Sequence, residues 1–230
     1  MLEQLLVYER SMFFMLNGSD SPFLDRFMWL YTGKAAWLPL AVFILFILLY
    51  KKNWRESLLI LVAITLVITL CDQFASHLIK PYFQRFRPTH HPAFMEEVKT
   101  VFGYRGGNYG FISSHAANAF GFAMFMSLLF RYRLFTIAIF LWAFLTAYTR
   151  VYLGVHFISD VVPGALAGLF FGWLVYTLYI YVREKIISGA KEKPPYSLYT
   201  GKQKTGIIFG ILITVSYLLI FNEPLTAYLR

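Results

Sequence analysis

The sequence predicts an all-α, polytopic membrane protein with six transmembrane helices and an interfacial helix at its N-terminus. Hydrophobic residues make up 58% of the 230 positions and charged residues only 14%, which leaves too little polar surface for a water-soluble globular protein. Apolar runs long enough to cross about 30 Å of hydrocarbon recur along the chain. Short basic connections separate these runs, as in proteins that follow the positive-inside rule.

The N-terminal segment, residues 1–34, is expected to lie at the membrane interface. Glu3, Glu9 and Arg10 interrupt its apolar residues and no small-residue cleavage site follows, so the segment is not a secretory signal. Polar residues alternating with apolar ones favour an amphipathic helix. Residues 17–22 contain Asn, Gly, Ser, Asp and Pro and predict a turn after this helix.

Six apolar runs are candidate transmembrane helices, and together they form a single integral-membrane domain, 1–230, with no soluble domain and no repeat. Their expected ranges are 35–50, 57–79, 114–130, 134–150, 157–182 and 205–221. Gly164, Gly168 and Gly172 recur every four residues in the fifth run, which indicates close packing against a neighbouring helix.

Two connections are longer than the others and predict different roles. Residues 80–113 hold aromatics, glycines and cations and are the predicted active-site loop, whereas residues 183–204 are basic and are the predicted cytoplasmic linker. With six spans, the basic loops 51–56, 131–133 and 183–204 share one face, which the positive-inside rule makes cytoplasmic. The loop 80–113 then faces the periplasm or the exterior of a bacterial inner membrane.

Three short stretches place cations, histidines and one carboxylate at the ends of apolar runs, where charged groups need a functional explanation. They are 80–88, 113–115 and 150–160, and the alternation of the spans brings all three to one membrane level. The candidate site residues within them are Lys80, Arg87, Ser113, Ser114, His115, Arg150, His156 and Asp160.

The cations of these stretches predict a phosphate site. Lys80, Arg87 and Arg150 can hold a phosphate group and neutralise the charge that builds on its oxygens during phosphoryl transfer. Ser113 can donate its hydroxyl, and the backbone N–H groups at Ser114 and the residue after it add donors at a helix start.

The two histidines and the carboxylate predict a covalent route. His156 is the candidate nucleophile, and Asp160, four residues later, can accept the proton of its other ring nitrogen and fix the tautomer. His115 is then the candidate acid, and later the base. The cations supply the electrostatic stabilisation that metal ions give elsewhere, so the sequence predicts no metal and no other cofactor.

The composition disfavours nucleic acid as a partner and excludes intrachain disulfides and cysteine metal motifs. The net charge of +9 does not indicate nucleic acid binding, because the basic residues are scattered through short loops between apolar runs. Cys71 is the only cysteine, so the chain has neither an intrachain disulfide nor a cysteine metal motif. A membrane lipid with a phosphate or diphosphate headgroup is the expected partner.

The three stretches closely resemble the signature motifs of the type 2 phosphatidic acid phosphatase superfamily of integral-membrane lipid phosphatases. The pattern is Lys, six residues, Arg-Pro; then Pro-Ser-Gly-His; then Ser-Arg, five residues, His, three residues, Asp. The resemblance implies a six-helix bundle, a phosphohistidine intermediate, no metal, and a lipid phosphate or diphosphate substrate. Ile112, Ser114 and Thr149 stand where proline, glycine and serine are usual, and none of these changes removes a catalytic group.

The resemblance also suggests a substrate. The compact chain and the glycine-rich loop 103–110 look like bacterial members that dephosphorylate undecaprenyl diphosphate, the predicted substrate, with phosphatidylglycerol phosphate and lipid A phosphate as alternatives. Transfer of the phosphoryl group to another acceptor would use the same residues. Arg105, Asn108 and Tyr109 are candidate headgroup contacts. A non-catalytic transporter or binding protein for anionic lipids is the alternative from another class, although the sequence lacks the internal symmetry typical of transporters.

Overall fold

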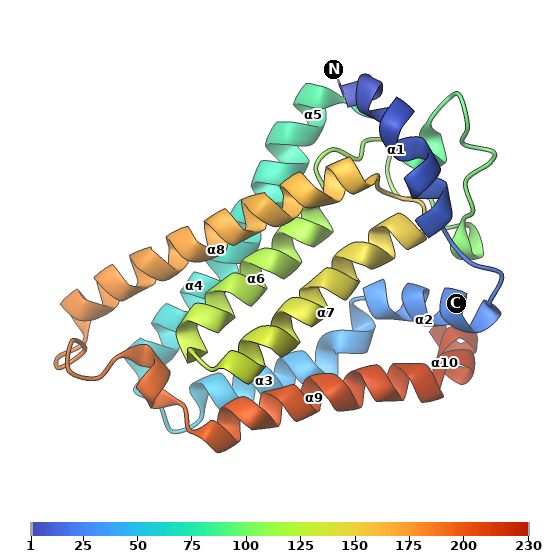
Figure 1. Cartoon of the computed structure of the whole chain (residues 1–230). Helices are drawn as coiled ribbons and strands as arrows, with labels where there is room; N and C mark the ends of the chain where they lie inside the picture. Colours follow the sequence, from blue (N-terminus) through green and yellow to red (C-terminus); the bar gives the residue numbers. More distant parts are fainter. Residues whose placement is uncertain (1, 230) are drawn as a thin grey trace.

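The computed structural model describes residues 2–229, with side chains from residue 8 onward, and consists of helices packed side by side (Figure 1). Within these residues there is no β-strand, which confirms the all-α class, and Phe86 and Tyr109 pair in an isolated bridge. The α-helices are α1 (Leu2–Leu16), α2 (Pro22–Thr32), α3 (Leu38–Leu49), α4 (Trp54–Asp72), α5 (Lys80–Phe83), α6 (Ser114–Phe130), α7 (Arg133–Tyr152), α8 (Ile158–Ile186), α9 (Gly201–Ile220) and α10 (Asn222–Leu229).

Several of these helices begin immediately after a residue whose side chain caps them. Ser21, Asn53 and Ser113 accept backbone N–H groups of the first turns of α2, α4 and α6. Thr200 and Gln203 form a reciprocal capping box at the start of α9. Caps satisfy N–H groups that have no partner within the helix, so these polar residues fix where the apolar runs become helical.

Among residues 2–229, four helical stretches are long and apolar enough to cross a membrane: Trp54–Phe83, Arg133–Tyr152, Ile158–Ile186 and Gly201–Ile220. The first is continuous because a π-helical segment, Gln73–Ile79, joins α4 to α5. A fifth span is possible if α2 and the stretch Ala35–Leu49, which meet at a 72° bend, cross together. Helices thus occupy all six predicted ranges, but α6 has only 17 residues, and six spans stay a prediction.

The helix α6 lies inside the bundle, in contact with α4, α7 and α8 (Figure 1). The glycines of α8 allow the closest of these contacts. A Cβ atom on Gly168 would lie 2.2 Å from the carbonyl oxygen of Ala117, and one on Gly172 would lie 2.4 Å from that of Gly121. The glycine repeat is therefore a packing feature, as the sequence predicted.

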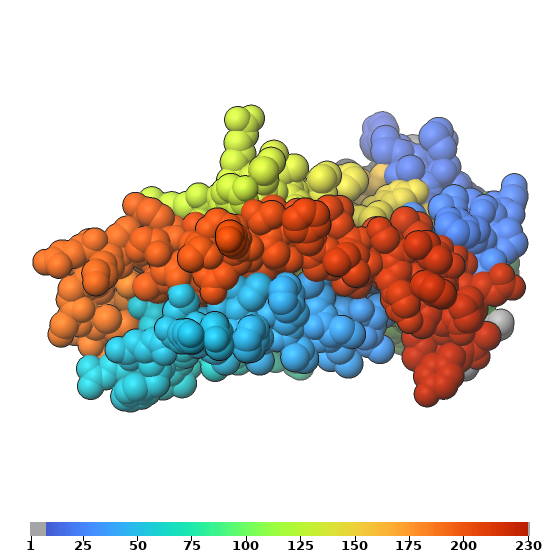
Figure 2. Space-filling view, turned by 90° about the horizontal axis from the view of Figure 1, so that it is seen from below, coloured from blue at the N-terminus to red at the C-terminus, as the bar shows by residue number. Residues whose placement is uncertain are grey.

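The outward faces of the long helices are apolar, as expected of a protein surrounded by lipid. Figure 2 shows α9 on the outside of the bundle, beside α3. The large exposed side chains of α8 and α9 include Leu166, Phe170, Trp173, Leu178, Phe209, Leu212, Ile213 and Ile220.

The two ends of the bundle differ. The connections α3–α4, α6–α7 and α8–α9 lie at one end, and the long connection after α5 lies at the other, together with α1 (Figure 1). The basic loops thus share one end, as alternating spans require. Which of the two ends faces the cytoplasm stays a prediction.

The range predicted as a linker, 183–204, is more ordered than its composition suggests. Arg183 still belongs to α8 and is buried, with its Nε 2.9 Å from both carboxylate oxygens of Glu56. Its two Nη atoms donate to the carbonyl oxygens of Ala190 and Lys193 at 2.9 and 2.8 Å. A buried arginine therefore ties this connection to the bundle, which the polar sequence alone does not reveal.

Candidate active site

The three motif stretches meet at one end of the bundle, where helices begin or end. The site residues come from the start of α5 (Lys80), the loop after it (Arg87), the cap and first residues of α6 (Ser113, Ser114, His115), the last turn of α7 (Arg150), the connection between α7 and α8 (His156) and the first turn of α8 (Asp160). The backbone N–H of Ser113 donates to the carbonyl oxygen of Asp160 at 2.9 Å. The starts of α6 and α8 are thereby joined directly.

The loop after α5 folds back over these helix starts as a narrow hairpin. The N–H of Arg87 donates to the carbonyl oxygen of Asn108, and that of Gly110 to the carbonyl oxygen of Arg85, each at 2.9 Å. A Cβ atom on Gly110 would lie 2.8 Å from Oδ2 of Asp160. Glycine is therefore required here because the loop backbone passes directly over the carboxylate.

A hydrogen-bonded chain runs through the middle of the site. Nη1 of Arg87 lies 3.2 Å from Nε2 of His156, and Nδ1 of His156 lies 3.4 Å from Oδ2 of Asp160. The same carboxylate oxygen accepts the backbone N–H of Phe157 at 3.0 Å. An imidazole whose Nδ1 carries the proton toward Asp160 leaves the Nε2 lone pair facing the cations.

The surroundings of His156 favour its neutral form. The side chain is buried, and burial lowers its pKa well below 6.5, with the positive charges of Arg87, Arg150 and Lys80 acting in the same direction. A neutral imidazole is the nucleophilic form. Burial and the neighbouring cations thus favour the unprotonated imidazole at neutral pH.

Among the described residues, the hydrogen-bond partners of Arg87 and Lys80 are neutral groups. The guanidinium of Arg87 donates to the carbonyl oxygens of Tyr109 and Val155, both at 3.1 Å, and the ammonium of Lys80 donates to the hydroxyl of Ser114 at 3.2 Å. Burial lowers the pKa of Arg87 to about 10, and the charge of Arg150 contributes to the decrease. Arg87 nevertheless keeps its charge at neutral pH.

Arg150 is also surrounded by neutral partners. Its Nη1 donates to the hydroxyl of Thr32 at 2.7 Å and its Nη2 to the hydroxyl of Tyr104 at 3.0 Å, while its buried Nε has no partner among the described residues. Thr32 and Tyr104 were not predicted from the sequence. Among the described residues, none of the three cations is paired with a carboxylate, so the site carries unneutralised positive charge.

The start of α6 contributes backbone donors and one wall of a cavity. Ser113 caps the helix, with its Oγ accepting the N–H of Ala116 at 3.4 Å, and the N–H groups of Ser114 and His115 have no acceptor within a helix that starts there. Ser114 and His115 line a cavity of about 580 Å³. Its other walls are mostly apolar and come from α3, α4, α6, α7 and α9, including Leu40, Ile44, Leu48, Leu61, Ile64, Ile68, Phe122 and Ile211.

Asp160 has a second partner that the sequence analysis did not assign to the site. Nη1 of Arg85 lies 2.8 Å from Oδ1 of Asp160, and Nη2 of Arg85 lies 2.6 Å from Oε1 of Glu9. Arg85 and Asp160 are both buried. The carboxylate that faces His156 is therefore paired with Arg85 and not with the three predicted phosphate ligands.

The predicted headgroup contacts lie at the edge of the site. Arg105 and Asn108 are exposed, and Nη1 of Arg105 points back to the carbonyl oxygen of Thr89 at 3.4 Å. Tyr109 takes part through its carbonyl oxygen, which accepts from Arg87. These residues shape the loop over the site, and their contact with a headgroup stays a prediction.

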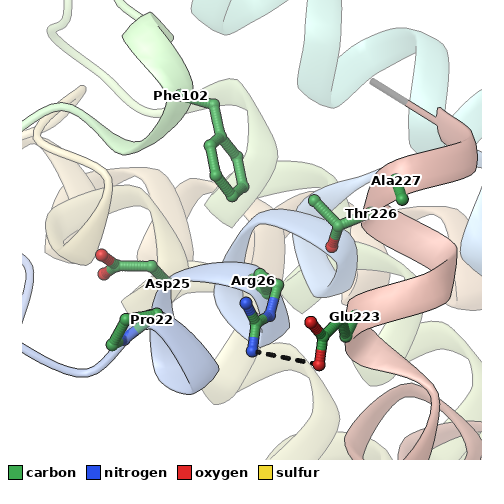
Figure 3. Close-up of a pocket in the computed structure, with 7 residues that line it drawn as sticks. All are labelled: Pro22, Asp25, Arg26, Phe102, Glu223, Thr226 and Ala227. Carbon is green, nitrogen blue, oxygen red and sulfur yellow. Dashed lines mark ion pairs between the residues drawn. The ribbon is translucent and has the colours of Figure 1, made fainter.

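Another hollow, of about 310 Å³, lies between α2, α10 and Phe102 (Figure 3). Nη2 of Arg26 and Oε2 of Glu223 stand 3.9 Å apart at its rim. None of the predicted site residues lines it. Arg26 there faces Glu223, and Asp25 pairs with Lys99 at 3.4 Å. The cation of this hollow therefore has a carboxylate partner, unlike the three cations of the motif site in the described part of the chain.

A metal centre was not predicted. Within the part of the chain that the structure describes, no group of three or more His, Cys, Asp or Glu residues is placed to hold a metal ion. The polar groups of the site are mainly cationic, which suits an anion.

Residues 57–184 match the PAP2 superfamily. Two relatives named lipid A 4'-phosphatase match nearly the whole chain. The protein of Porphyromonas gingivalis is 40% identical over 229 residues, 100% of this chain and 97% of the relative. That of Bacteroides thetaiotaomicron is 39% identical over 225 residues, 96% of this chain and 98% of the relative.

Two solved structures have a similar fold. The crystal structure of Aquifex aeolicus LpxE superposes with a TM-score of 0.55 at 27% identity, covering 74% of this chain and 95% of that chain. The PAP2-type phosphatidylglycerolphosphate phosphatase of Bacillus subtilis gives a TM-score of 0.57 at 24% identity, covering 80% of this chain and 89% of that chain. At 24% identity, the likeness to the Bacillus subtilis structure supports the fold of this chain and nothing further.

Proposed function

This chain belongs to the PAP2 superfamily of membrane lipid phosphatases, and from that premise we propose that it hydrolyses the 4'-phosphate of lipid A. The observation that carries the reaction type is the position of His156. Its neutral imidazole lies among the buried Arg87 and Arg150 and the half-buried Lys80, whose hydrogen-bond partners among the described residues are all neutral. Such a site attracts a phosphate dianion and holds a nucleophile against it.

In the first step, Nε2 of His156 attacks phosphorus while the bond between phosphorus and the lipid oxygen breaks. Asp160 accepts the Nδ1–H and stabilises the positive charge that grows on the ring. The bound phosphate dianion offsets the surrounding cations and favours protonation of His115, which as the imidazolium gives its proton to the departing lipid alkoxide. Lys80, Arg87 and Arg150 hold the three other phosphate oxygens. Because the protein partners of these cations are neutral, their positive charge is available to stabilise the oxygens.

In the second step, water attacks the phosphohistidine. His115, now neutral, takes a proton from that water, and the bond between Nε2 and phosphorus breaks. Inorganic phosphate leaves and both histidines return to their starting forms. The cations take the electrostatic role that metal ions have in other phosphatases, so we propose a metal-independent reaction.

The substrate choice corrects the sequence analysis. Undecaprenyl diphosphate was the first expectation, but the relatives that cover nearly the whole chain are lipid A 4'-phosphatases, which favours the alternative. The loop 103–110 favours a phosphomonoester over a diphosphate. Its exposed residues Arg105 and Asn108 do not form a second cationic site beside Arg87 that could hold another phosphate group. The apolar cavity that begins at His115 offers room for an acyl chain of the same lipid.

The test is phosphate release by the purified chain in detergent from a panel of lipids. The panel holds lipid A phosphorylated only at the 4' position, lipid A phosphorylated only at the 1 position, undecaprenyl diphosphate and phosphatidylglycerol phosphate. We expect the 4'-monophosphate to have the highest kcat/KM. A higher value for any other member would overturn the proposed substrate, and binding without phosphate release from every member would favour the transporter or binding protein.

A further inference from the structure

The N-terminal helix reaches the catalytic carboxylate through one arginine. Glu9 of α1 holds Arg85 with a contact of 2.6 Å between Oε1 and Nη2, and Arg85 holds Asp160 with a contact of 2.8 Å between Nη1 and Oδ1. The side chains of Arg85 and Asp160 are 1% and 0% exposed, and that of Glu9 is 12% exposed. Asp160 in turn faces His156.

Ser159 closes this network on the other side. Its N–H donates to Oε2 of Glu9 at 3.0 Å and its hydroxyl to Oε1 at 2.6 Å, while Nη1 of Arg85 donates to the same hydroxyl oxygen at 2.6 Å. Glu9 therefore fixes both the arginine and the first turn of α8. Helix α1, the loop after α5 and the first turn of α8 are thereby held together around the Asp160 carboxylate.

Aromatic packing keeps α1 in place over this network. The ring of Phe157 lies 4.4 Å below the guanidinium carbon of Arg85 and 5.3 Å from the ring of Phe13, which α1 contributes fully buried. An arginine stacked on an aromatic ring is restrained in the plane of its donors. The direction in which Arg85 donates is thus set by its neighbours.

The charges around Asp160 explain why this carboxylate needs Arg85 as a partner. A buried carboxylate without a partner would be protonated, and a protonated Asp160 could no longer accept the Nδ1–H of His156. Lys80 and Arg87 also act electrostatically on Asp160, but they are the predicted phosphate ligands, and a bound dianion would offset their charge. Arg85 is the cation in direct contact with Asp160, and Glu9 orients it.

We propose that Glu9 and Arg85 are positioning residues for the reaction: Arg85 holds Asp160 ionised and aimed at His156, and Glu9 orients Arg85, so that the docked N-terminal helix is part of the active site. This inference rests on the proposed function, in which His156 is the nucleophile. It assigns to α1, predicted only as an interfacial helix, a direct share in catalysis.

The experiment measures kcat, KM and the pH dependence of phosphate release from dioctanoyl phosphatidate in detergent, on the full chain. Glu9→Gln keeps the shape of the side chain and removes its charge, and we expect kcat to fall about tenfold with KM nearly unchanged. Arg85→Gln is expected to lower kcat further, and Arg85→Lys, which restores the charge, is expected to recover part of the loss.

The pH profile separates positioning from a merely structural role. Removing the positive charge of Arg85 makes protonation of the His156–Asp160 pair easier, so the acid limb shifts to higher pH. Removing the negative charge of Glu9 makes protonation harder, so the limb shifts to lower pH. Lys80, Arg87, Arg150 and His115 also act electrostatically on this pair and are unchanged in both variants.

The matched control is Arg10→Gln, on the same helix. Arg10 pairs with Glu97 at 2.9 Å on the surface, where both side chains are about half exposed, and it does not touch the network. We expect wild-type kcat and pH dependence from it. An equal loss in Arg10→Gln and Glu9→Gln would overturn the proposal, and so would wild-type kcat with an unshifted limb in Glu9→Gln.

A folding failure would not remove the test. If Glu9→Gln cannot be purified folded, Ser159→Ala, which removes one contact to Glu9 and one to Arg85, takes its place with the same expected loss of kcat and the same overturning result. The choice of substrate keeps the two proposals apart. Failure of lipid A in the panel would leave these rates on dioctanoyl phosphatidate intact, because they compare variants on a different phosphomonoester.

Discussion

The two ends of the bundle each bury an arginine beside α8, and the difference between them separates structure from function. At the end with the basic loops, each of the three guanidinium nitrogens of Arg183 has an acceptor, Glu56 or one of two backbone carbonyl oxygens. At the motif end, Arg150 bonds to two hydroxyls and its Nε has no partner among the described residues. Arg183 therefore has a carboxylate partner and Arg150 has none within residues 8–229, because the nearby Asp160 pairs with Arg85 instead.

This difference shows how charge balance can be used to locate a site in a membrane protein. A buried cation is stable when a carboxylate and good hydrogen bonds compensate it, as at Arg183. A group of cations that lacks such compensation is retained at a cost in stability, and the cost is offset when an anion binds. The motif end is therefore expected to bind phosphate, and the other end to hold the connection 183–204 against the bundle.

The largest effect is expected at the nucleophile of the uncompensated end. His156→Ala should lower the rate of phosphate release by about 10⁴-fold or more, because it removes the atom that accepts the phosphoryl group. The folded fraction in detergent should not change. Residual activity close to that of the wild type would show that another group attacks phosphorus.

At the compensated end, a substitution should change the stability of the protein and leave the rate of phosphate release unchanged. Arg183→Ala leaves the Glu56 carboxylate buried without its partner, and the free energy of unfolding should fall by about 3–5 kcal/mol, with kcat of the folded protein unchanged. Denaturant unfolding in detergent measures the first and initial rates the second. The double variant Glu56→Leu with Arg183→Met should recover most of the stability; if it does not, the pair is not the source of the loss.

Arg150→Met should give the opposite pattern. It keeps the apolar stem but removes a charge without a carboxylate partner, so kcat should fall by about 10²–10³-fold while the free energy of unfolding changes little. The same two measurements apply. A large loss of stability together with an unchanged rate would contradict the contrast between the two ends.

The pH dependence of kcat/KM should show a smaller effect of the uncompensated charge. Burial and the cations hold the pKa of His156 well below 6.5, so the imidazole stays neutral as the pH falls, and the acid limb of kcat/KM should lie below pH 6.5. Arg87→Gln removes one of these charges, so the pKa of His156 rises and the limb should move to higher pH. Comparison of the two enzymes on one substrate cancels the titration of the substrate itself. An identical limb in both would show that Arg87 does not act on His156.

The smallest expected effect is that of chelation. If the cations supply the stabilisation that metal ions give elsewhere, dialysis against EDTA should leave kcat and KM unchanged. The control is the same dialysis followed by Mg²⁺ or Zn²⁺. Loss of activity on chelation and its return with a divalent ion would contradict a metal-independent reaction.

The helix ranges could be predicted from the sequence because hydropathy and caps are local signals. Helices lie at all six expected ranges, and α6 begins at the expected residue, directly after its cap Ser113. The motif residues could also be predicted to meet, since alternating spans return them to one level. These predictions required only the order of the segments along the chain.

The partners of the motif residues were not predictable, because no local pattern marks a contact between distant segments. Glu9 lies 76 residues before Arg85, and Thr32 lies 118 residues before Arg150. Arg85 was visible in the first motif stretch but carried no sign that it would pair with Asp160. The loop 183–204 was predicted to be a linker for a similar reason, since only the fold shows that Glu56 receives Arg183.

The central claim is that the uncompensated end transfers a phosphoryl group to His156. The most direct measurement is a rapid quench of the enzyme with lipid A labelled with ³²P at the 4'-phosphate, followed by mapping of the labelled peptide. The account predicts an acid-labile, base-stable label on the peptide that contains His156, absent in His156→Ala. Phosphate release without any label on that peptide, or a label on another residue, would contradict it.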